Sequence, residues 1–177
     1  IITQRQCALF SLFHPPMTAI RFGTDGETDL SKLVIIRGNS GSGKTTVAKV
    51  LQHELGHNVM VVSQDVVRRE MLRVKDGAGT KALPLLSELL MYGKNNCETV
   101  ILEGILNSKW YMPLFELAKN TFKDEIRDYY CGLTFTETLI KHGTKSNKDD
   151  FGEEEMKKRR HKKDYIKIIP EKTFCKT

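Results

Sequence analysis

The amino-acid sequence predicts an α/β fold in which a mostly parallel sheet of five strands lies between two layers of helices. Three observations lead to this prediction. Short apolar runs rich in valine, isoleucine and leucine alternate with longer segments in which apolar residues recur at helical spacing. A glycine-rich turn joins the first apolar run to the first helical segment. Polar residues, acids among them, follow the runs at the ends where open α/β sheets bind ligands.

The glycine-rich turn, residues 38–45, fits the phosphate-binding P-loop pattern G-x-x-x-x-G-K-[ST]. The apolar run 33–36 precedes it as a buried strand, and a helix that ends at Gly56 follows it. Strand, turn and helix in this order are typical of a three-layer P-loop NTPase sandwich. The residues predicted to bind the nucleotide are Gly38, Asn39, Ser40, Gly41, Ser42, Gly43, Lys44, Thr45 and Thr46.

Each residue type in the turn has a chemical reason to be there. Glycines permit backbone angles that let successive N–H groups converge on an anion. Lys44 supplies a positive charge for the β- and γ-phosphates, and the Thr45 hydroxyl is a ligand for Mg²⁺. The turn therefore predicts ATP and Mg²⁺ as cofactors, with Lys44 also acting in catalysis.

The remaining elements follow from periodicity and from turn residues. Trp110, Tyr111 and Phe115 lie at helical spacing, which favours core packing over a base-stacking platform. Thr80 is a candidate cap, and the helix near Pro113 begins either at residue 108 or at the proline. The predicted strands are 58–63, 99–102, 126–133 and a last, short one formed by 166–169 and the residues after Pro170. The predicted helices are 66–74, 80 onward, 108–122, 134–142 and 153–165.

Two acids lie where predicted strands end. Asp65 follows the second strand, where it either orients and deprotonates an acceptor hydroxyl as a base or holds Mg²⁺ through water. It is also a candidate N-cap of the helix at Val66, and capping is compatible with catalysis. Glu103 follows the third strand, as a ligand of the metal shell, as a substrate-binding residue or as an ordinary solvated strand end.

Basic residues lie near these acids and near the end of the chain. Arg68 and Arg69 share a helix face with Asp65, where they either grip an anionic substrate or form a solvated basic face. Arg159 and Arg160 are candidates for closing over the phosphates during catalysis, with Lys145 and Lys148 behind them; the alternative is again a solvated face.

Bulk properties narrow the class of protein. The 177 residues suit one domain, residues 18–177, preceded by an extension or tail at 1–17. The net charge of +6 suits nucleotides but is too small to indicate nucleic acid by itself. The four scattered cysteines predict reduced thiols and a cytoplasmic location, and no apolar run is long enough to span a membrane. The sequence leaves the oligomeric state open.

With these motifs, the chain resembles small P-loop kinases of the zeta-toxin, gluconate-kinase and chloramphenicol-phosphotransferase type, over residues 32–171. It also resembles bacterial ATP-binding proteins labelled as uridine kinases, on Phe-Gly-Glu-Glu-Glu-Met at 151–156. The resemblance implies a nucleoside-monophosphate-kinase-like fold, ATP–Mg²⁺ at 38–46, Asp65 as base and a helical lid at about 141–163. Lys145 stands where a lid arginine is expected, and the C-terminus is expected to be truncated.

The predicted function is a kinase that transfers the γ-phosphoryl group of ATP–Mg²⁺ to a hydroxyl of a small molecule, of nucleoside, sugar or antibiotic type. Two alternatives stay open. One is a polynucleotide 5′-hydroxyl kinase, which the positive net charge motivates. The other is a nucleotide-binding regulatory module without transfer activity. The sequence does not identify the acceptor.

Overall fold

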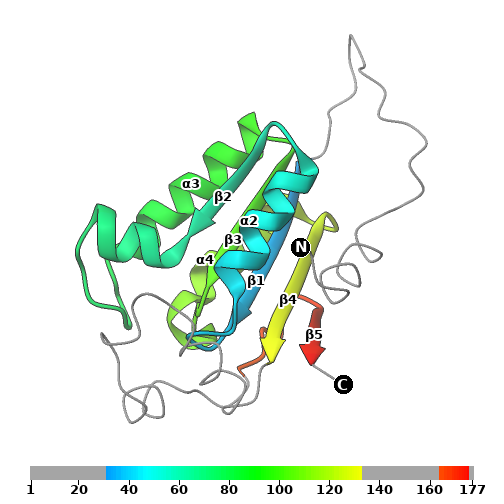
Figure 1. The fold of residues 1–177 in the computed structure, drawn as a ribbon. Helices are drawn as coiled ribbons and strands as arrows, with labels where there is room; N and C mark the ends of the chain where they lie inside the picture. Colours follow the sequence, from blue (N-terminus) through cyan, green and yellow to red (C-terminus); the bar gives the residue numbers. More distant parts are fainter. Residues whose placement is uncertain (1–30, 133–163, 176–177) are drawn as a thin grey trace.

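The computed structural model describes residues 31–132 and 164–175. Five strands form one sheet in the order β2-β3-β1-β4-β5, and every neighbouring pair is parallel (Figure 1). The predicted parallel sheet is confirmed, and β1, the strand that leads into the P-loop, lies at its centre. The strands are β1 (Lys32–Gly38), β2 (Val59–Ser63), β3 (Thr99–Gly104), β4 (Ile126–Gly132) and β5 (Glu171–Cys175).

Helices cover both faces of this sheet. One face carries α2 (Lys44–Leu55), and the other carries α3 (Ala82–Asn96) and α4 (Ser108–Phe122), as Figure 1 shows. A short helix, η1 (Val66–Met71), follows β2. Gly56 ends α2 at a φ of 84°, as the sequence predicts.

The two faces of β1 belong to two separate cores. Leu33 and Ile35 pack with α3 and α4, whereas Val34 and Ile36 pack with Ala48 of α2. Alternation with a period of two is what a strand imposes on its side chains. Because both faces are buried, residues 33–36 of β1 form a continuous apolar run, which makes this strand easy to recognise in the sequence.

Helix α4 begins at Ser108, so the alternative start at Pro113 is wrong. The Asn107 side chain accepts a hydrogen bond of 3.0 Å from the Lys109 N–H, which caps the first turn. Pro113 lies inside the helix, where it lacks an N–H for the ladder but does not end it.

The helix predicted at 66–74 is shorter and wider than expected. It spans Val66–Met71 and is a π-helix, in which the Leu72 N–H donates to the Val67 carbonyl over 3.1 Å. Arg73 then takes a φ of 53°, and the chain leaves the helix there. A π-turn has no sequence periodicity that separates it from an α-turn over six residues, so the sequence could not indicate it.

Several predictions concern residues outside 31–132 and 164–175. These are the helix at 134–142, the lid at about 141–163 with Lys145, Lys148, Arg159 and Arg160, and the extension at 1–17. Of the helix predicted at 153–165, only Asp164 and Tyr165 are described, and these two residues are not helical.

Arg37, which no sequence motif singled out, is fully buried on the α4 side of the sheet. Its guanidinium lies 5.4 Å from the Phe115 ring and donates a 2.8 Å hydrogen bond to the Leu106 carbonyl. Carboxylates surround it at 3.9 Å (Asp128), 3.7 Å (Asp164) and 3.4 Å (Glu171). The residue directly before the P-loop thus ties β1 to β4, to β5 and to the segment that leads into β5.

Asp128 is the most deeply buried of these acids, and burial raises its pKa to about 7 from the usual 3.8. Arg37 lowers the pKa, and Glu171 raises it. Since the folded state holds this proton more tightly than the unfolded chain, the contribution of Asp128 to stability falls as pH rises from about 4 to about 7.

We therefore expect Asp128→Asn to flatten the loss of stability between pH 5 and pH 8. One pKa unit corresponds to about 1.4 kcal/mol, and about two units lie between pH 5 and the raised pKa of about 7, so the expected effect over this range is about 2 to 3 kcal/mol. Urea unfolding at several pH values measures the effect. Asp124→Asn, at an exposed aspartate, is the control. Parallel pH curves for Asp128→Asn and the parent protein would contradict the prediction.

Candidate active site

The P-loop lies at the carboxyl end of β1, and its glycines take the backbone angles that the motif predicts. Gly38, Gly41 and Gly43 have φ values of 146°, 78° and 87°. A Cβ on Gly38 would also lie 2.7 Å from the Cys131 carbonyl oxygen, so the loop packs against β4 without room for a side chain.

Lys44 begins α2, and its side chain lies back across the P-loop. Its Nζ donates a 2.8 Å hydrogen bond to the Asn39 carbonyl and lies 3.5 Å from the Ser42 hydroxyl. The residue is only 8% exposed. The ammonium therefore stays beside the backbone amides that the motif gathers, where a phosphate group would meet both.

Thr45, at the start of α2, is hydrogen-bonded to Glu103 of β3. The Thr45 hydroxyl donates to Glu103 Oε1 over 3.2 Å, and the Ser63 hydroxyl donates to the same oxygen over 2.5 Å. Glu103 lies inside β3, which extends two residues beyond the predicted end at Leu102, and it is buried. The reading of Glu103 as a solvated strand end is therefore wrong.

These oxygens fit the predicted magnesium ion. Mg²⁺ is usually held by one or two protein oxygens together with phosphates and waters, and a hydroxyl beside a carboxylate is such a donor set. Among the described residues, no group of three or more histidine, cysteine, aspartate or glutamate side chains forms a metal site of its own. Thr45 and Glu103 are thus the residues that would hold the ion, together with the nucleotide.

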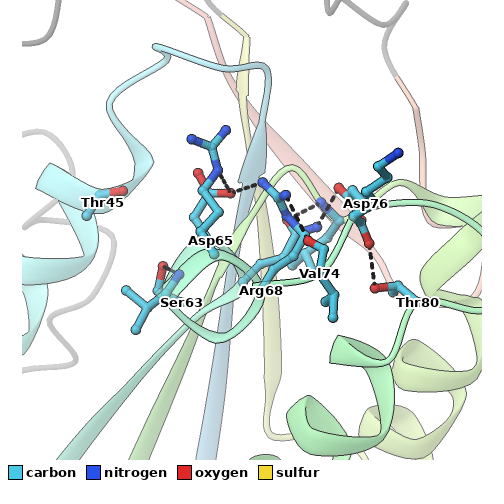
Figure 2. A network of polar contacts seen from close by, with 12 residues as sticks. Thr45, Ser63, Asp65, Arg68, Val74, Asp76 and Thr80 are labelled. Carbon is cyan, nitrogen blue, oxygen red and sulfur yellow. Dashed lines mark hydrogen bonds and ion pairs between the residues drawn. The ribbon is translucent and has the colours of Figure 1, made fainter. Parts of the chain in front are cut away.

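Asp65 follows β2 and faces the P-loop side of the site (Figure 2). Its backbone is already helical, at φ −69° and ψ −39°, and its side chain makes no capping hydrogen bond. The N-cap interpretation is therefore not supported. Instead, Oδ1 is 2.8 Å from Arg68 Nη2 and 3.4 Å from Arg69 Nε. Both arginines lie on the face of Asp65, as their spacing predicts.

A cavity of about 140 Å³ brings the predicted residues together. Lys44, Thr45, Asp65 and Glu103 all line it, along with residues of the P-loop and the start of the β3–α4 loop. Residues that follow β1 and β2 meet the end of β3 here, because parallel strands place their carboxyl ends at one edge. A nucleotide phosphate and a carboxylate base would therefore share one small space.

Sequence reasoning missed four polar residues around this site: Ser63, Gln64, Asp76 and Tyr111. Tyr111 is buried in the core, as predicted, but its hydroxyl bonds to Asp76 over 2.7 Å. Gln64 is 2% exposed, and its amide reaches both of these residues. The sequence offered one indication of a role for Gln64: it is a polar residue at the end of an apolar strand, directly before Asp65.

Residues 31–132 and 164–175 include no helix with the length and apolar character needed to cross a membrane.

Known proteins resemble the chain mainly in fold. No curated protein matches it at a significant level. A protein in the Pnkp1/Rnl/Hen1 RNA repair complex superposes with a TM-score of 0.57 at 16% identity, over 73% of this chain and 43% of that one. The chain thus spans less than half of that protein's length.

Two kinase structures are also similar. The Mycobacterium tuberculosis APS kinase in complex with AMPPNP and APS has a TM-score of 0.51 at 18% identity, over 69% of this chain and 76% of that one. A gluconokinase from Sinorhizobium meliloti 1021 has a TM-score of 0.51 at 11% identity, over 73% of each chain. At these identities the likeness shows the fold alone.

A family model described as an AAA domain matches residues 33–128. The match runs from β1 into β4 and includes the P-loop, Asp65 and Glu103, and it covers more than half of the chain. The chain therefore belongs to this AAA domain family, and its fold is that of the small P-loop kinases.

Proposed function

We propose that the protein is an ATP-dependent kinase that transfers the γ-phosphoryl group to a hydroxyl of a small molecule. One observation carries the proposal: the Asp65 carboxylate lines the same cavity as Lys44 and Thr45. A carboxylate beside a phosphate cradle is what a phosphotransferase needs to position an acceptor hydroxyl. A protein that only binds nucleotide has no use for a base at this point.

Each residue has a separate task in this proposal. The P-loop amides and Lys44 hold the β- and γ-phosphates and stabilise the negative charge that develops on them. Thr45 and Glu103 would hold Mg²⁺, which would neutralise part of the negative charge of the phosphates. Ser63 fixes the Glu103 carboxylate through its 2.5 Å hydrogen bond. Asp65 orients the acceptor hydroxyl and accepts its proton.

The arginines leave one oxygen of Asp65 for this task. Both guanidinium groups contact Oδ1, so Oδ2 is the oxygen that an acceptor hydroxyl would meet. The two charges also make the surroundings of Asp65 positive overall, which favours an acceptor that carries an anionic group. Of the two arginines, Arg68 is better placed to bind such an anionic group, because its side chain is less exposed to solvent than that of Arg69, at 14% against 45%.

This positive character supports a second candidate, a polynucleotide 5′-hydroxyl kinase. Such an acceptor carries phosphates near its reacting hydroxyl, and paired arginines are suited to phosphate binding. The net charge of +6 also favours a polyanion. Strongly salt-dependent binding of a 5′-hydroxyl oligonucleotide would favour this candidate over a neutral sugar or antibiotic.

The test is a screen with labelled ATP against nucleosides, sugars, sugar acids, aminoglycosides, amphenicols and a 5′-hydroxyl oligonucleotide. On the best acceptor, we expect Asp65→Asn to lower kcat at least about 100-fold, because general-base catalysis contributes 10²- to 10⁴-fold. Asp124→Asn, an exposed aspartate, is the control. Equal turnover by Asp65→Asn and the parent would show that Asp65 is not the base. ATP binding without transfer to any acceptor would favour a regulatory module.

A further inference from the structure

Three side chains from separate segments form a polar cluster next to Asp65, in which Gln64 and Tyr111 are buried and Asp76 is exposed. We call Gln64, Asp76 and Tyr111 the Gln64 cluster. The Gln64 amide nitrogen donates to the Tyr111 hydroxyl over 2.8 Å and to Asp76 Oδ2 over 3.0 Å. The Tyr111 hydroxyl donates to Asp76 Oδ1 over 2.7 Å. Both carboxylate oxygens of Asp76 and both donors of the Gln64 amide are therefore used.

The remaining oxygen of the Gln64 amide holds a third segment. Gln64 Oε1 accepts a 3.0 Å hydrogen bond from the Leu106 N–H, in the loop between β3 and α4. Gly104 makes room for this arrangement, because a Cβ at that position would lie 2.6 Å from the Gln64 Cβ. The Gln64 amide is buried, all of its hydrogen-bonding groups are used, and its neighbours pack closely around it. It therefore holds these segments rigidly in place.

Asp76 belongs to the loop that follows η1, residues 72–80. This loop is closed by its own hydrogen bonds, since the Thr80 hydroxyl donates to the Lys75 carbonyl over 3.0 Å (Figure 2). The Thr80 N–H also donates to the Gly77 carbonyl over 3.3 Å. A loop that is closed in this way moves largely as one unit. Anchoring Asp76 therefore places the whole loop.

The loop in turn holds Arg68. The Val74 N–H donates to the Arg68 carbonyl over 2.9 Å, and Arg68 Nη1 lies 3.4 Å from the Val74 carbonyl. Arg68 Nη2 contacts Asp65 over 2.8 Å, and Figure 2 shows these contacts in sequence from Val74 to Asp65. Gln64 is also the residue before Asp65 in the chain. The Gln64 cluster thus reaches Asp65 both along the backbone and through the loop.

We propose that the Gln64 cluster is a set of positioning residues for the acceptor half of the site, which holds the 72–80 loop so that Arg68 keeps Asp65 aimed at the acceptor hydroxyl. This inference rests on the proposed kinase function. It predicts that substitutions in the Gln64 cluster impair use of the acceptor but not binding of ATP. Lys44 and Thr45, which would contact the nucleotide, are held by Asn39 and Glu103, outside the cluster.

Tyr111→Phe tests the proposal with little disturbance of the core. The ring of Tyr111 stays buried against its neighbours, while the hydroxyl that donates to Asp76 is removed. Tyr92→Phe is the matched control, because Tyr92 lies on α3 with 60% exposure. Asp76→Asn is a second variant, which keeps the shape of the side chain but replaces one of its two acceptor oxygens with an NH2 donor.

The first measurement is hydrogen exchange of the backbone amides in residues 66–80, which needs no acceptor. We expect Tyr111→Phe to accelerate exchange there about fivefold to tenfold, as the loss of one hydrogen bond allows, and Tyr92→Phe to leave it unchanged. Unchanged exchange in both Tyr111→Phe and Asp76→Asn would overturn the proposal. If the protein transfers no phosphoryl group to any acceptor, the kinase function and the positioning role both fail, whereas the exchange result still shows whether the cluster holds the loop.

The second measurement is steady-state kinetics with ATP–Mg²⁺ and the best acceptor of the screen. We expect Tyr111→Phe to raise KM for the acceptor about tenfold while KM for ATP changes less than twofold. A general loss of stability would instead lower the active fraction and leave both KM values alone. Equal changes in the two KM values, or parent values of both kcat and KM for the acceptor, would show that the cluster does not position the acceptor side.

Discussion

Lys44→Ala is expected to lower phosphoryl transfer from ATP about 10³-fold or more. Lys44 is the cation of the P-loop, and its buried ammonium lies 2.8 Å from the Asn39 carbonyl at the centre of the loop. Removing a single preorganised donor from a site of this kind costs 10²- to 10³-fold in kcat, and Lys44 also binds the ground-state phosphates. Initial rates with labelled ATP and the best acceptor measure the loss.

A matched control comes from the same helix. Lys49 lies on the exposed side of α2, so Lys49→Ala removes an equal charge without touching the cavity, and we expect its rate to stay within about twofold of the parent. Lys44→Arg should also be poorly active, because the planar fork of arginine does not replace a compact ammonium in a tight loop. A rate for Lys44→Ala within tenfold of the parent would show that the P-loop is not the donor site.

The parts of the site that the sequence predicted are formed by residues that are close together along the chain. Strand, turn and helix at residues 33–56 are consecutive, and the glycines, Lys44 and Thr45 are each required by their place in the turn. Asp65 and Glu103 could be added because parallel strands bring their carboxyl ends to one edge, whatever the order of the strands. A cavity that Lys44, Asp65 and Glu103 line together is the result.

The parts that the sequence did not predict depend on contacts between distant residues. Gln64 and Tyr111 are 47 residues apart, and Arg37 and Glu171 are 134 apart. Neither pair has a spacing or a motif that a single sequence reveals. Arg37 even interrupts the apolar pattern of β1, and its meaning appears only when β4 and β5 place Asp128 and Glu171 beside it. Likewise, the sequence leaves the roles of Glu103 open, and the proposal that it helps to hold the metal ion rests on its hydrogen bond to Thr45.

Arg37→Met is expected to lower the free energy of unfolding by about 3 to 5 kcal/mol. Breaking a buried ion pair by removing one partner leaves an uncompensated charge, and such losses are of this size. Here the guanidinium is fully buried, and the side chains of Asp128 and Glu171 are 0% and 3% exposed. Urea unfolding measures the loss. Arg127→Met, at an exposed arginine on β4, is the control and should change stability by less than about 0.5 kcal/mol.

The pH dependence separates lost charge pairing from lost packing. Because the pKa of Asp128 is raised to about 7, this carboxyl is largely neutral at pH 5.5 and ionised at pH 8. Arg37→Met should therefore cost more at pH 8 than at pH 5.5, and adding Asp128→Asn should recover part of the loss at pH 8 only. If the loss were the same at both pH values and additive in the double variant, Arg37 would act through its packing between Phe115 and Tyr130 and not through its charge.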